Sequence, residues 1–123
     1  MNDMFALVKK INAQILMDLD ISFTEKELEI HSSWLNRDIG FFEDPEHFQG
    51  LDVWVNKFYK QLKNKEKYNH CMLYKLIAEK WIVIAFNTKR YKKLFRNRLF
   101  QLDRIAYMRS LYRRVFIKVM KIQ

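Results

Sequence analysis

The chain has 123 residues, half of them apolar, and a formal net charge of +9 at pH 7. It contains only two glycines, one proline and one cysteine. Sandwiches and barrels need many turns, and turns favour glycine, proline and asparagine, so this composition argues against them. It predicts a few long helices with short connections. We expect residues 1–123 to fold as one all-α domain, which at this length can bury a real core without disulfides.

The cysteine and the apolar runs bear on the compartment. Cys71 can form no internal disulfide, and Asp3, Lys9 and Lys10 interrupt the apolar run that a signal peptide would need. The longest uncharged apolar run, residues 81–86, is far shorter than the roughly 20 residues that cross a bilayer. We therefore expect a cytoplasmic protein.

Apolar residues recur every three or four positions over residues 3–19 and predict a first helix with one buried face. The residues of that face are Met4, Leu7, Val8, Ile11, Ile15 and Leu19. Thr24 and Glu27 then have the spacing of a capping box, in which side chains satisfy the free amides of a helix start. A second helix is predicted from there to about Arg37. Its buried candidates are Leu28, Ile30, Trp34 and Leu35.

Residues 38–50 contain the proline and both glycines, so we expect the one sizeable loop there. Asp44 and Pro45 predict an N-cap followed by the first helical position, where the missing N–H of proline costs nothing. Apolar residues then step by three and four and predict a third helix, which crosses Gly50 at some cost. They are Phe48, Leu51, Val55, Phe58 and Leu62. A polar connection, residues 63–67, follows.

Residues 72–86 are the most apolar stretch, since twelve of the fifteen are apolar. At helical spacing the three charges, Lys75, Glu79 and Lys80, share one narrow stripe. A helix that is apolar on its other sides must be surrounded by protein, so we expect a compact bundle of about five helices around it. Residues 81–86 would also suit a buried strand. We favour a helix, because the chain offers no second convincing strand.

The final segment, residues 89–122, is predicted to form a long basic amphipathic helix after a joint at Asn87 and Thr88, with room for one break. Its apolar face would consist of Phe95, Leu99, Leu102, Ile105, Ala106, Met108, Tyr112, Val115, Phe116 and Val119. The cations predicted to lie off that face include Arg96, Arg104, Lys118 and Lys121.

Few side chains suggest catalysis or metal binding. The candidate ligands and nucleophile are His31, His47, His70 and Cys71. Their spacing is not that of a metal site, and a lone cysteine beside an apolar helix usually packs as a small hydrophobe. The acids around the proline, Glu43, Asp44 and Glu46, are more typical of helix caps and solvated charge than of acid–base catalysis. The isolated glycines form no phosphate loop. We expect no catalytic residue, no metal and no cofactor.

The charge is distributed unevenly along the chain. Residues 1–85 carry 11 lysines and arginines against 13 acids, whereas residues 86–123 carry 12 against the single acid Asp103. A solvated face normally mixes both signs, so this excess predicts a negatively charged partner. The cations we expect to bind it are Lys89, Arg90, Lys92, Lys93, Arg96, Arg98, Arg104, Arg109, Arg113 and Arg114.

Two kinds of partner fit this segment. The first is nucleic acid, bound by backbone contacts with little base readout, because cations alternate with aromatics over residues 89–98 and no helix-turn-helix is recognisable. The second is an acidic protein, bound by a small helical inhibitor, immunity protein or adaptor of the kind common in phages and mobile elements. Its exposed aromatic anchors would be Phe41, Phe42 and Trp54.

Two further possibilities are weaker. The last helix could lie on an anionic membrane surface, because it has a basic face opposite an apolar one. The aromatic content also exceeds the need of a small core, so the surplus could form the seam of a homodimer. Of all these alternatives, we favour nucleic acid.

Overall fold

The computed structural model describes residues 3–65 and 69–122, and these residues are helical throughout apart from short connections. The helices are α1 (Asp3–Asp18), α2 (Glu25–Leu35), α3 (Ile39–Phe42), α4 (Pro45–Lys63), α5 (His70–Asn87), α6 (Tyr91–Leu94), α7 (Arg98–Leu102) and α8 (Arg104–Ile122). No strand occurs within these ranges, so the predicted all-α class is confirmed. Residues 81–86 are helical, as we favoured. In the described part of the chain, no helix has the length and apolar character of a membrane span.

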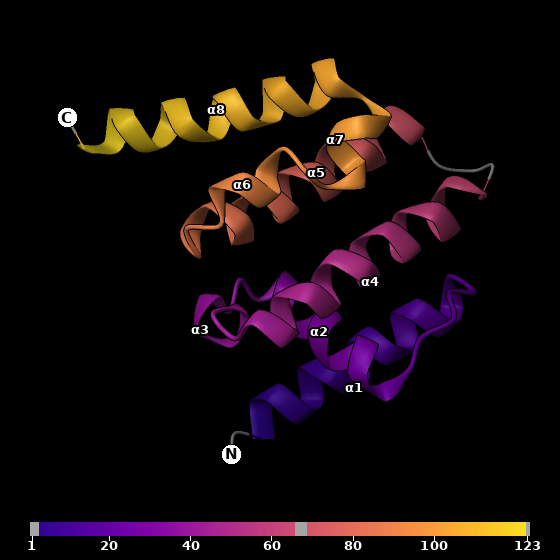
Figure 1. The fold of residues 1–123 in the computed structure, drawn as a ribbon. Coiled ribbons are helices and arrows are strands. Elements are labelled where there is room, and N and C mark those ends of the chain that lie inside the picture. Colours follow the sequence, from indigo (N-terminus) through magenta and orange to yellow (C-terminus); the bar gives the residue numbers. More distant parts are fainter. Residues whose placement is uncertain (1–2, 66–68, 123) are drawn as a thin grey trace.

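The helices are layered nearly in the order of the chain (Figure 1), with α1 at one edge and α8 at the other. Helix α1 packs on α2, α2 packs on α4, and α4 packs on α5. Helix α5 also contacts α2, α3, α6 and α8, so it is the central helix that its composition predicted. It thereby joins the near-neutral and the basic parts of the sequence.

The core lies between α4 and α5. Leu51 and Trp54 of α4 and Trp81, Ile82 and Ile84 of α5 are almost inaccessible to solvent. Burial of side chains of this size is the main favourable term of folding, at about 2 kcal/mol each. The beginning of α5 differs from the prediction, because Met72 and Leu76 are more than half exposed there. The central helix is therefore surrounded by protein only over its second half.

The predicted helix starts are present. Thr24 Oγ1 accepts a hydrogen bond from the Glu27 amide at 3.1 Å, and the Glu27 carboxylate accepts one from the Thr24 amide at 2.9 Å. Asp44 caps α4, with Pro45 in its first turn. Gly50 has a packing role, since a Cβ at this position would lie 2.5 Å from Ile30 Cδ1. Its missing side chain allows α2 and α4 to approach closely.

The predicted loop at residues 38–50 is much shorter than expected. Asp38 accepts a hydrogen bond from the Phe41 amide and thereby starts the single turn α3 inside the predicted loop, and α4 begins at Pro45, as predicted. Helix α2 ends at Leu35, which is exposed, so the prediction that Leu35 is buried was wrong.

The predicted buried face of α1 was wrong for four of its six residues, while Val8 and Leu19 are partly buried. Met4, Leu7, Ile11 and Ile15 are between 49% and 63% exposed. The helix instead turns Asn12 and Leu16 toward α2, where the Asn12 amide donates a hydrogen bond to the Ser32 hydroxyl at 3.0 Å. Helix α1 therefore packs with the side that carries Asn12 and Leu16 against α2. Ser32 provides the partner of the Asn12 amide, and a buried amide without a partner would cost free energy.

The C-terminal segment is divided twice rather than at most once. Lys89 ends α5 with a left-handed backbone (φ 61°), Asn97 caps α7 by accepting from the Phe100 amide, and Asp103 accepts from the Ala106 amide at the start of α8. Side chains that can bond their own backbone favour such helix starts. A single helix from residue 89 would leave these polar groups without their partners.

The apolar face predicted for this segment is therefore largely on the surface. Leu99 is buried, but the exposed members are Phe95, Leu102, Ile105, Met108 and Tyr112. Tyr107 and Leu111 provide the buried contacts of α8 instead. The side chains of Val115, Phe116, Lys118, Val119 and Lys121 lie outside the described part of the structure, as do residues 66 and 67 of the polar connection.

Candidate nucleic-acid interface

The ten cations predicted as a binding surface lie on α6, α7 and the first half of α8, and in the connections beside them. Eight of them are exposed, and Arg90 and Arg114 are half-buried. Figure 1 shows that α6, α7 and α8 form the edge of the bundle opposite α1. The fold therefore brings these cations to one end of the molecule.

Most of these cations have no acidic partner among the described residues. Arg113 is the exception, with its guanidinium 3.2 Å from Glu79 Oε1. Lys93 lies near Asp52 without forming an ion pair, and its charge lowers the pKa of that carboxyl against the larger opposite effect of burial. Among these ten cations, Arg113 is thus the one that forms an ion pair with an acid of an earlier helix within the described residues.

Arg90 has a structural role that the sequence did not indicate. Its guanidinium donates hydrogen bonds to the Phe42 and Glu43 carbonyl oxygens, at 2.7 and 2.9 Å. It also lies over the Phe48 ring, 4.5 Å from the centroid. These contacts attach the end of α5 to the end of α3, so Arg90 has fewer donors to offer a partner than the other predicted cations.

A buried cluster of polar side chains holds α6, α7 and α8 in position. The buried Asn97 amide donates to the Lys93 and Leu94 carbonyl oxygens and to the Tyr107 hydroxyl. Burial raises the pKa of Tyr107 to about 12. The Tyr74 hydroxyl donates to the Leu99 and Asp103 carbonyl oxygens, which ties α5 to the end of α7. Neutral side chains thus set the positions of α6, α7 and α8, and the cations remain on the outside.

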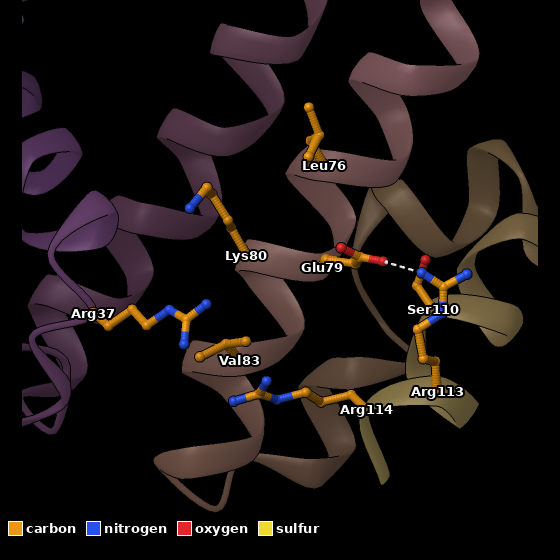
Figure 2. Close-up of a pocket in the computed structure, with 8 residues that line it drawn as sticks. All are labelled: Arg37, Leu76, Glu79, Lys80, Val83, Ser110, Arg113 and Arg114. Carbon is orange, nitrogen blue, oxygen red and sulfur yellow. Dashed lines mark hydrogen bonds and ion pairs between the residues drawn. The ribbon is translucent and has the colours of Figure 1, made fainter. Parts of the chain in front are cut away.

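A cleft between α5 and α8 gathers cations from three parts of the chain (Figure 2). Its volume is about 290 Å³. It is lined by Arg37, Leu76, Glu79, Lys80, Val83, Ser110, Arg113 and Arg114. Sequence reasoning had selected Arg113 and Arg114 but not Arg37 or Lys80, because these two lie in the near-neutral part of the sequence. No spacing in the sequence relates them to α8.

A second basic pocket, of about 310 Å³, lies between α4 and α7. Lys60 and Lys63 of α4 and Arg98 of α7 line it, together with Tyr59. Burial raises the pKa of the Tyr59 hydroxyl, so Tyr59 is neutral at physiological pH. The lysines were absent from the predicted set, although two cations in the last turn of a helix were visible in the sequence.

The aromatic anchors proposed for a protein partner are not available as predicted. Phe42 and Trp54 are completely buried. Phe41 is half-buried and stacks on His47, with 3.9 Å between ring centroids. Trp54 lies three residues after Leu51 and four before Phe58, so the helical period already placed it beside the apolar face of α4. For Phe42, in the single turn α3, only the tertiary packing shows that it belongs to the core.

The candidate ligands His31, His47 and Cys71 belong to three different helices, α2, α4 and α5. His31 is buried against Trp34, Trp54 and Phe58, and its Nδ1 accepts a hydrogen bond from Trp54 Nε1 at 3.0 Å. Burial lowers the pKa of His31 to about 4, so this imidazole is neutral at pH 7. Cys71 is exposed. No group of three potential metal ligands occurs among the described residues, and the side chain of His70 is outside them.

Fold and site together define a helical bundle with a cationic surface at one edge. No protein-family model matches the chain, and neither do the curated proteins or the solved structures with which it was compared.

Proposed function

We propose that the protein binds nucleic acid through the cations of α6, α7 and α8, by contacts to the phosphate backbone. The observation that supports this proposal is the unpaired charge. Of the ten predicted cations, Arg113 has a carboxylate partner and Arg90 is bonded to carbonyl groups, and the other eight form no ion pair within the described residues. Cations of this kind neutralise phosphates and release bound counterions.

Aromatic side chains beside the cations add a second kind of contact. Tyr91 and Phe95 are each 48% exposed, and they alternate with Lys92, Lys93 and Arg96. Exposed rings can stack on unpaired bases, at roughly 1–3 kcal/mol per base. We recognise no helix-turn-helix in the sequence, so we expect binding with little sequence preference. The cytoplasm stays the expected compartment.

The test is fluorescence anisotropy with labelled single- and double-stranded DNA and RNA over a salt series. We expect binding that weakens with salt, with a log–log slope near −5 for about six phosphate contacts. No binding to any of these probes at about 50 mM salt, where such contacts are strongest, would contradict the proposal.

A pair of matched variants localises the surface. In R96Q/R109Q two exposed cations of the proposed surface are neutralised, and we expect the slope to become shallower by about 2. The control K10Q/K26Q removes the same charge from exposed positions on α1 and α2. Equal losses of affinity in both variants would show that net charge, rather than this surface, is responsible.

The second candidate function is docking on an acidic protein, as an inhibitor, immunity protein or adaptor of phage or mobile-element type. A shallow groove on α8 favours it, because Ile105, Met108 and Tyr112 lie there between Arg104, Arg109 and Arg113. Methionine, tyrosine and arginine are enriched in protein interfaces. Recovery of one acidic protein from a nuclease-treated extract, together with no nucleic-acid binding, would favour this function.

A further inference from the structure

We propose that the cleft between α5 and α8 binds a phosphate monoester, namely the terminal phosphate of a nucleic-acid strand or of a nucleotide. That the biological ligand is a nucleic acid or nucleotide rests on the proposed function. The cleft would be a discrete binding site within the extended cationic surface. Figure 2 shows the side chains that line this cleft.

The charge of the cleft is strongly unbalanced. Four cations and one acid line it, and the acid, Glu79, is already bonded to Arg113 at 3.2 Å. The other three cations, Arg37, Lys80 and Arg114, form no ion pair with any described residue. Like charges that share a cleft repel one another, so an anion between them removes an unfavourable interaction as well as adding a favourable one.

The side chains that line the cleft are of the types that bind phosphate. Arginine presents a planar fork that bonds two phosphate oxygens, and lysine adds a point charge. The Ser110 residue, 4% exposed, places a hydroxyl group at the wall of the cleft, and Val83 supplies an apolar wall. A set of cations, a hydroxyl and an apolar wall can hold both the charge of a phosphate and the edge of a sugar.

The size of the cleft selects the end of a strand over its middle. A volume of about 290 Å³ is at the lower limit of small-molecule pockets and holds a single phosphate-bearing group. A phosphodiester within a strand carries one charge and must leave the cleft on two sides. A terminal phosphate carries up to two charges, and its chain leaves on one side only.

The backbone fixes Arg37 at this position. It follows the C-cap of α2 in the left-handed conformation (φ 54°). Its amide donates to the Trp34 carbonyl at 3.1 Å, and the Asp38 amide donates to the Ser33 carbonyl at 3.0 Å. This is the Schellman arrangement, which usually has glycine at the left-handed residue. An arginine in this place gives the cleft a guanidinium from a rigid turn.

That conformation provides a variant that removes the guanidinium without harm to the fold. Glycine adopts a left-handed backbone more readily than arginine, so R37G should be at least as stable as the parent protein. Lys89 ends α5 in the same conformation (φ 61°) and does not line the cleft. K89G is the matched control, because it makes the same backbone change and removes one cation of the extended surface, so it should weaken binding of both forms of a strand equally and leave the ratio of their affinities unchanged.

The experiment compares one oligonucleotide in two forms, with a 5′-phosphate and with a 5′-hydroxyl, each labelled at the other end. A 5′-hydroxyl strand two nucleotides longer controls for the added charge, because each added phosphodiester contributes one negative charge. We expect about tenfold tighter binding of the phosphorylated form, lost in R37G and in R114Q but kept in K89G. Equal affinity for the two forms, or equal loss of preference in R37G and K89G, would overturn the inference.

A second experiment distinguishes a nucleotide from a strand end as the source of the phosphate. It also tests the cleft independently of the proposed function. Titration of adenosine monophosphate and of adenosine, followed by NMR, tests the cleft without a strand. Binding of the monophosphate alone, abolished by R37G, supports the site even if no oligonucleotide binds and the proposed function fails. Binding of oligonucleotides irrespective of their ends, without binding of the monophosphate, keeps the proposed function and rejects the site.

Discussion

The helices α1 to α4 and the segment from α6 to α8 use their cations differently. In the first region three lysines form ion pairs with acids from another part of the region, each within 3.8 Å. The pairs are Lys9 with Glu25, Lys57 with Glu27, and Lys65 with Asp20. In the second region only Arg113 has such a partner among the described residues. Residues 3–65, which include the first region, carry 11 acids against eight lysines and arginines, whereas the second region has almost no acids.

The charged groups that stabilise the fold therefore differ from the charged groups that we propose bind nucleic acid. Both regions use buried neutral groups at their packing contacts, such as Asn12 with Ser32 and Asn97 with Tyr107. Charged groups take part in folding contacts mainly in the first region. Neutralising cations should therefore affect stability there and affinity in the second region, and three predictions test this division.

The largest expected effect is the pH dependence that His31 gives to the first region. The pKa of His31 is 6.5 in an unfolded chain and about 4 in the folded protein, because the imidazole is buried. Between these values the unfolded chain binds more protons, so the free energy of unfolding falls as the pH is lowered. We expect a loss of about 3 kcal/mol between pH 7 and pH 4 from this group.

The measurement is urea denaturation at both pH values, with H31Q as the comparison. Glutamine can accept the hydrogen bond from Trp54 but cannot be protonated in this range. The difference in stability between pH 7 and pH 4 should be smaller in H31Q by that amount. If both proteins lose the same free energy on acidification, His31 does not titrate as proposed.

The next effect concerns the polar cluster under the cationic segment. Asn97 caps α7, and its buried amide bonds two carbonyl oxygens and Tyr107. Asn97→Ala removes a cap and leaves buried acceptors without donors, so we expect a loss of about 2 kcal/mol by urea denaturation. Gln101→Ala, at an exposed position in the same helix, should cost less than about 0.5 kcal/mol. Similar costs for the two variants would show that the cluster does not define this region.

The smallest effects come from single cations, and they test the division directly. Lys57 bonds Glu27 at 2.9 Å in a partly exposed pair, so Lys57→Gln should lower stability by about 0.5 kcal/mol and leave nucleic-acid binding unchanged. Arg109 is exposed with no ion pair to a described residue, so Arg109→Gln should leave stability unchanged and weaken binding about threefold. The opposite pattern of effects would remove the distinction between the two regions.

Local chemistry predicted the helix starts and the most regular helices. Thr24 with Glu27, and Asp44 with Pro45, begin helices because their side chains and ring satisfy nearby backbone groups without help from the rest of the fold. The breaks at Asn97 and Asp103 have the same origin, but the sequence prediction allowed for one break and placed neither of the two. Their signal was present in the sequence, but the apolar period across residues 95–112 outweighed it.

The burial of α1 and α8 could not be predicted, because both helices carry apolar residues on more than one side. Ile11 and Ile15 continue a regular stripe, yet α1 turns Asn12 and Leu16 inward. Which side of α1 is buried depends on Ser32 of α2, whose hydroxyl accepts a hydrogen bond from Asn12. The sequence of α1 alone does not show that this acceptor is present. On α8, Tyr107 is buried in the same way, because the Asn97 amide donates a hydrogen bond to its hydroxyl.

The sequence by itself determined the helical class, the central position of α5 and the excess of positive charge at the C-terminal end. These follow from composition, from an apolar stretch with one charged stripe, and from the count of acids and bases. Only the tertiary structure decided which cations meet. Arg37, Lys80 and Arg114 line one cleft because α5 packs against both the end of α2 and α8, and packing between distant segments leaves no period in the chain.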